Sequence, residues 1–75
     1  MISAKIRLSS IEDVRNFVNA VTAFDVEVDL SSGRYTVDGK SIMGIFSLDL
    51  VKPIDLVAHC ETCDDLLAAI KPYII

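Results

Sequence analysis

The sequence predicts a single α+β domain, in which an antiparallel sheet carries helices on one face and is open to water on the other. Two kinds of segment lead to this fold class, and they follow one another along the chain. Segments with alternating apolar and polar residues indicate half-buried strands, and segments with apolar residues three and four apart indicate amphipathic helices. Half-polar strands are typical of antiparallel sheets with one solvated face.

The first 22 residues predict a strand and then a helix. Apolar residues occupy every second position from residue 2 to residue 8, which is the period of a strand. Ser9 and Glu12 have the spacing of a capping box at the start of a helix. The apolar side chains behind them have helical spacing and are expected to face the sheet: Ile11, Val14, Phe17, Val18 and Val21.

Residues 24–38 predict a hairpin. The first strand is expected over Phe24–Leu30, and Ser31-Ser32-Gly33 forms the turn. The returning strand covers Arg34–Asp38, with Tyr35 and Val37 directed inward. The acidic residues between the apolar ones, Asp25, Glu27 and Asp29, are interpreted as the solvated face.

The rest of the chain predicts a short helix, a central strand and a final helix. The short helix follows Lys40, and Pro53 ends the segment behind it. The strand is expected over Ile54–Cys60 and the last helix from Glu61 or Thr62 to Pro72. The apolar tail, residues 73–75, is expected to fold back on the core.

Composition restricts the function classes. The 75 residues form one domain, 1–75, and 52% of them are apolar, which favours a packed globule over disorder. The net charge is −4 and the seven basic residues are scattered, which argues against a nucleic-acid partner. No apolar run approaches a membrane span, so no membrane association is expected and the protein is predicted to be cytoplasmic.

The segment from Lys40 to Leu48 is unusually apolar for its length. Ser41 is suited to cap a helix, and two apolar faces follow it. Ile42, Met43 and Phe46 form one face, while Ile45 and Leu48 form the other. A two-turn helix cannot bury both, so one of the two sets is predicted to stay exposed. Exposed Met and Phe side chains, as in the first set, would suit a surface that binds a protein partner.

The element order, together with the segment 40–48, resembles HPr, the small phosphocarrier protein of the bacterial sugar phosphotransferase system. The likeness runs without a gap from about Phe24 to Leu50 and continues more weakly through the last strand and helix. It implies an open-faced β-sandwich with strand order 1-4-2-3. It also implies that Ser41 is phosphorylated by a dedicated kinase. The same likeness places Ile42, Met43 and Phe46 outside, in contact with partners such as a serine kinase/phosphorylase or a transcriptional regulator, and Ile45 and Leu48 inside.

The phosphotransfer site of that family has no counterpart in this sequence. HPr has a histidine at the start of its first helix, followed by arginine and proline. The imidazole accepts the phosphoryl group, and the arginine guanidinium pairs with the negative charge of that group. Here Ser10 occupies the histidine position, with Glu12 and Asp13 in place of the other two. The only histidine, His59, falls at the end of the fourth strand. The chain is therefore expected to be no enzyme, but a regulatory protein like the catabolite-repression paralogue of HPr.

The alternative function is a cysteine-based redox or metal site at Cys60 and Cys63. A Cys-x-x-Cys pair between a strand and a helix can support such chemistry, although a zinc site needs a second pair of ligands. The competing interpretation places one cysteine in the sheet and the other in the first turn of the helix, without chemistry. No cofactor and no resident metal are expected.

Overall fold

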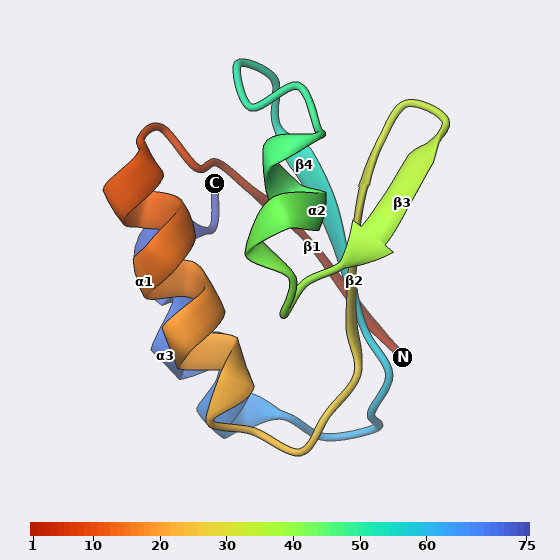
Figure 1. The fold of residues 1–75 in the computed structure, drawn as a ribbon. Coiled ribbons are helices and arrows are strands. Elements are labelled where there is room, and N and C mark those ends of the chain that lie inside the picture. The colour runs from red at the N-terminus through yellow and green to blue at the C-terminus, as the bar shows by residue number, and fades with distance from the viewer.

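The computed structural model describes all 75 residues. Its elements are, in order, β1 (Ile2–Ile6), α1 (Ile11–Thr22), β2 (Val28–Ser32), β3 (Tyr35–Asp38), α2 (Ile42–Phe46), β4 (Ile54–Ala58), α3 (Asp64–Ile70) and a 3-10 turn (Lys71–Tyr73). The strands form one antiparallel sheet in the order β1-β4-β2-β3, as the family resemblance implied (Figure 1). None of the helices is both long and apolar enough to span a membrane.

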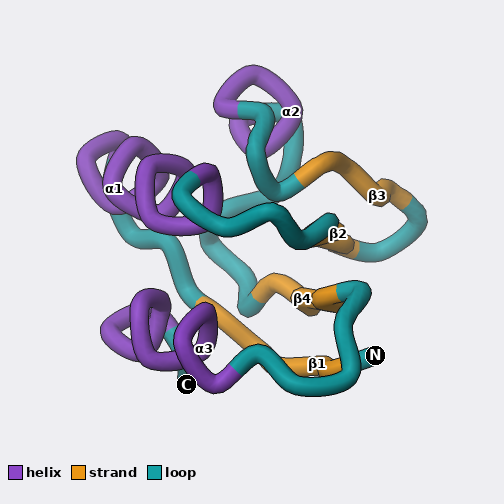
Figure 2. The backbone as a smooth tube through the Cα atoms, turned by 90° about the horizontal axis from the view of Figure 1, so that it is seen from below, coloured by secondary structure: helices purple, strands orange, loops and turns teal.

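The hydrophobic core lies between the sheet and the helices. Figure 2 shows α1 and α3 side by side, covering the same face of the sheet, and the two helices are in contact. The strand register places Leu56 of β4 opposite Leu30 of β2 and Ala4 of β1, so the central strand receives apolar neighbours from both sides. All buried side chains are apolar and belong to one cluster. The predicted α+β architecture with one covered face is confirmed.

Helix α1 begins with a cap that differs from the predicted one. The Ser10 side-chain oxygen accepts a hydrogen bond from the Asp13 backbone N–H at 3.1 Å, and the Ser9 N–H donates to the Asp13 carboxylate at 3.0 Å. The acid that bonds back to the backbone before the helix is therefore Asp13 and not Glu12, because the helix begins one residue later than expected. Ile11 is exposed, contrary to the prediction, since the helix packs on the core only from Val14 onward.

Strand β2 is shorter at its start than the alternating pattern indicates. It begins at Val28 rather than Phe24, and Val28 pairs with Ala58, the last residue of β4. One further hydrogen bond, from His59 N–H to the Glu27 carbonyl at 2.9 Å, continues the pairing. Residues before this point have no strand beside them, so they bend in spite of their alternation.

The hairpin turn also lies further along the chain than predicted. β2 extends through Ser32, and the turn consists of Gly33 and Arg34, with φ of 62° at Gly33. A glycine with positive φ at the first central position suits a two-residue hairpin turn. Tyr35 is exposed rather than inward, because it sits at the turn end of the edge strand β3.

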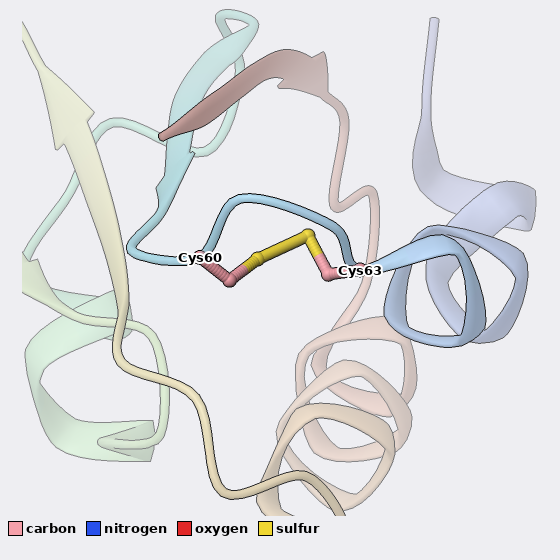
Figure 3. Close-up of a disulfide and its surroundings, with 2 residues drawn as sticks. All are labelled: Cys60 and Cys63. Atoms are coloured by element: carbon pink, nitrogen blue, oxygen red, sulfur yellow. A yellow bond between two sulfur atoms is a disulfide. The ribbon is translucent and has the colours of Figure 1, made fainter.

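The connection between β4 and α3 is longer than expected. β4 ends at Ala58 and α3 starts at Asp64, so both cysteines lie in the loop between them. The Cys60 N–H bonds to the Ala58 carbonyl at 3.0 Å and turns the chain away from the sheet. Cys60 and Cys63 are joined by a disulfide, as Figure 3 shows. The expectation of one cysteine in the sheet and the other in the first turn of the helix was wrong, because Cys60 follows β4 and Cys63 precedes α3.

The C-terminal tail folds back on the core, as predicted. The Tyr73 ring meets the Phe17 ring edge to face, with centroids 5.8 Å apart. The Arg7 N–H donates to the Tyr73 carbonyl at 2.8 Å, and the Ile75 N–H donates to the Lys5 carbonyl at 3.0 Å. These backbone bonds cover the outer edge of β1, which would otherwise be open to pairing with another chain.

Candidate functional site

A close backbone approach fixes the start of α2. Gly39 is buried, and its N–H donates to the Val28 carbonyl at 2.7 Å. A Cβ at Gly39 would lie 2.9 Å from the Val28 Cγ1 atom, so this approach requires glycine. The contact ties the end of β3 to the first residue of β2 and thereby sets where α2 emerges from the sheet.

Ser41 is the N-cap of α2. Its side-chain oxygen accepts a hydrogen bond from the Gly44 N–H at 3.1 Å, and its own N–H donates to the Asp38 carbonyl at 3.0 Å. The residue is half-buried, so its hydroxyl lies at the protein surface beside the first turn of the helix. Capping uses one lone pair of the oxygen and leaves its O–H group free.

Helix α2 has one buried and one exposed face. Ile45 and, just beyond the helix, Leu48 are buried in the core cluster. Met43 is 80% exposed, Phe46 40% and Ile42 36%. We call these three exposed side chains the α2 patch. A helix of five residues that keeps three large apolar side chains at the surface presents an uncommon concentration of apolar area.

The start of α1 carries two acidic side chains and a serine that caps the helix. Ser10 is engaged with Asp13, and Glu12 is exposed beside them. An open cleft of about 480 Å³ lies next to this turn, between the β1–α1 segment and the α2–β4 loop. Its lining is mixed: Arg7, Leu8, Ser9, Leu48, Asp49, Leu50 and Val51.

The single histidine lies far from this turn. His59 follows β4, whose end is at the opposite end of the molecule from the start of α1 (Figure 1). Its Nε2 atom is 2.6 Å from an Asp29 carboxylate oxygen on the open face of the sheet. The histidine is thus paired with one member of the predicted acidic row.

The other charged groups are dispersed. The Lys40 ammonium donates to the Phe24 carbonyl at 2.8 Å, so it holds the bend before β2 instead of facing Ser41. Lys5 pairs with Asp55 at 3.3 Å across β1 and β4. No group of three or more His, Cys, Asp or Glu side chains that could hold a metal ion is present.

Sequence reasoning missed two features of these surfaces. The Asp29–His59 pair depends on the register of β2 against β4, which places the two segments side by side although they are 30 residues apart. The Gly39–Val28 approach is likewise a contact between strands. The Cys-x-x-Cys spacing is a signal for the disulfide that the sequence contains. The length of the loop, which only the structure shows, was needed to choose a disulfide over two unpaired cysteines in the sheet and the helix.

Comparison with known proteins identifies the family. The family model for the PTS HPr component phosphorylation site matches residues 13–74, and a search of the curated proteins finds no match. Among solved structures, the HPr-C-His protein of Thermoanaerobacter tengcongensis superposes with a TM-score of 0.80 at 22% identity, covering 96% of this chain and 89% of that one. The phosphocarrier protein HPr of Bacillus anthracis str. Ames gives 0.74 at 22% identity, with coverage of 99% and 96%.

A third similar structure is the catabolite repression containing protein Crh of Bacillus subtilis, described as a dimer with a swapped domain. It has a TM-score of 0.67 at 24% identity and covers 93% of this chain and 87% of that one. At such identities the three structures establish the fold alone, whereas the family model covers most of the sequence. The chain belongs to the HPr family, the small phosphocarrier proteins of the phosphotransferase system.

Proposed function

We propose that this protein is a non-catalytic regulatory member of the HPr family, which binds a protein partner through the α2 patch and is switched by phosphorylation of Ser41. The observation that carries the proposal is the exposure of Met43, Phe46 and Ile42 on a helix whose other face is buried. Flexible and aromatic apolar side chains at the surface are suited to protein recognition. The partner classes are a serine kinase/phosphorylase and a transcriptional regulator.

The absence of a phosphohistidine relay is part of the same proposal. Its support is the chain's single histidine, which stands at the end of β4 and is paired with Asp29. At the start of α1, the Ser10 oxygen accepts from the Asp13 N–H, and two carboxylates occupy the first turn. These charges repel a phosphoryl group, and no histidine is present there to accept one or to activate the hydroxyl.

Phosphorylation of Ser41 would change the α2 patch directly. A phosphoserine carries a charge of about −1.5 to −2. Because Ser41 immediately precedes Ile42 and Met43, this charge would lie at the border of the apolar surface. A partner that buries the patch would then either pair the phosphate with a cation or be excluded by it.

The test uses the family's serine kinase and ATP, read by intact mass. Wild-type protein should gain one phosphoryl group and the variant Ser41→Ala none. Met43→Asp should slow the reaction by about tenfold or more, which corresponds to a loss of about 1.4 kcal/mol in docking. Val51→Asp is the matched control, since Val51 is 85% exposed but lies outside α2.

Two results would contradict the proposal at separate points. Equal phosphorylation of Met43→Asp and wild type would remove the docking role of the α2 patch, and an unmodified wild type would remove the switch. Incubation with phosphoenolpyruvate and the first enzyme of the relay should yield no acid-labile phosphate. A phosphorylated His59 would disprove the loss of carrier function.

A further inference from the structure

The loop between β4 and α3 contains chemistry that the proposed function does not use. Cys60 lies two residues after β4, and Cys63 immediately precedes α3. Their Cα atoms are 6.3 Å apart, within the range that a disulfide spans without backbone movement, and the two sulfurs are bonded (Figure 3). Both cysteines of the chain are used in this pair.

The two cysteine residues differ in exposure. Cys63 is 7% exposed and belongs to the core cluster, whereas Cys60 is half-buried. The residues between them, Glu61 and Thr62, are exposed, so the loop projects from the surface. A reagent approaching from solvent therefore meets Cys60 first.

The bond can open without disturbing the elements on either side. The His59 and Cys60 amides are bonded to the Glu27 and Ala58 carbonyls, so the chain is held up to the first cysteine in either redox state. The Leu67 N–H donates to the Cys63 carbonyl at 3.0 Å, and this bond holds the chain at the second cysteine. Neither set of hydrogen bonds includes a sulfur atom.

The charges around the loop are negative. Glu61 stands between the cysteines, and Asp64 and Asp65 follow the second one, all three exposed. Like charges disfavour an anionic sulfur beside them, while a catalytic cysteine needs a stabilised thiolate. The pair is therefore suited to be the substrate of a thiol–disulfide oxidoreductase rather than the catalyst of such a reaction.

A cleft beside the loop offers a contact surface for such a partner. It measures about 330 Å³ and lies between the α1–β2 bend and the start of α3. Phe24 and Val26 give it an apolar wall, and Cys63 borders it. The β4–α3 loop lies at the end of the molecule opposite to the α2–β4 loop (Figure 1).

We propose that Cys60 and Cys63 form a reversible dithiol–disulfide site that is reduced by a protein dithiol of the thioredoxin class. The partner's thiolate attacks Sγ of Cys60, the bond between the two cysteines breaks, and Cys63 leaves as a thiolate and takes up a proton. The partner's second thiolate then attacks the partner sulfur of the mixed disulfide, and Cys60 leaves and is protonated. Two electrons and two protons pass to this pair, and the partner's dithiol becomes a disulfide.

The experiment follows free thiols in the full-length protein by alkylation and intact mass. Protein equilibrated in a glutathione redox buffer should bind no alkylating reagent. After treatment with reduced thioredoxin, both cysteines should become alkylated at the same time. Thioredoxin should act at least about tenfold faster than glutathione at equal thiol concentration. A thioredoxin variant that lacks its second cysteine should be trapped on Cys60, as peptide mapping would show.

Controls separate redox exchange from other roles of the cysteines. The double variant Cys60→Ser, Cys63→Ser should have the same unfolding midpoint with and without reductant, while the midpoint of wild type should fall on reduction. Two free thiols in the oxidising buffer, a rate no faster than that of glutathione, or stoichiometric zinc held by the purified protein would each overturn the proposal. Trapping on Cys63 instead would overturn the assigned direction of attack.

Discussion

Substitution of Gly39 by alanine tests how the sheet positions α2. The added Cβ would lie 2.9 Å from the Val28 Cγ1 atom and 3.0 Å from the Val28 carbonyl oxygen. Neither neighbour can rotate away freely, because Val28 is buried and its carbonyl accepts the Gly39 N–H. Overpacking of this kind typically costs about 1–3 kcal/mol. For a domain of this size each kcal/mol lowers the melting temperature by about 4–8 °C.

The assay is urea unfolding of Gly39→Ala, Val28→Ala and the double variant. Val28→Ala alone should cost about 2 kcal/mol for the lost apolar contacts. In the double variant the new methyl group occupies space left by the valine, so the combined cost should fall below the sum by about 1 kcal/mol. Additive costs, to within about 0.5 kcal/mol, would refute the assigned contact. Gly33→Ala is the control, because nothing lies within 4 Å of its Cβ and its cost should add to that of Val28→Ala.

Two further predictions concern helix α1. Ser10→Ala removes the acceptor for the Asp13 N–H and should lower the free energy of unfolding by about 1 kcal/mol. Ser9→Ala should change it by less than about 0.5 kcal/mol, because the Ser9 bond to Asp13 comes from its backbone; equal effects would contradict the cap assignment. Phe17→Leu should cost about 2 kcal/mol through a cavity and the lost edge-to-face contact, measured by thermal unfolding. Its cost should shrink when Tyr73 is also leucine, and an unchanged cost would exclude the ring contact.

The family and the faces of α2 could be anticipated from the sequence because their signals are local. Ser41 has the side chain of an N-cap, and the spacing of Ile42, Met43 and Phe46 places them on one helix face. The choice of which face to bury needed the family resemblance, since Ile45 and Leu48 are equally apolar. The structure buries these two residues and leaves the other three exposed.

Errors in the predicted elements occurred where a partner strand ends. Phe24 and Val26 alternate with acids as in a strand, yet they bend, because β4 stops at Ala58 and offers them no hydrogen bonds. Tyr35 has a strand position, but it is exposed at the turn end of the edge strand β3. Alternation reports the chemistry of the side chains, but a strand also needs backbone groups beside it.

The sequence by itself determined the fold class, the order of elements, the cap at Ser41 and the presence of a single histidine, His59. These follow from periodicity, from cap chemistry and from residue identity, none of which depends on distant parts of the chain. Tertiary structure alone decided the Asp29–His59 pair, the tight approach of Gly39 to Val28 and the disulfide between Cys60 and Cys63. Each of these depends on strand register or loop length, and both are set only when the sheet and helices pack together.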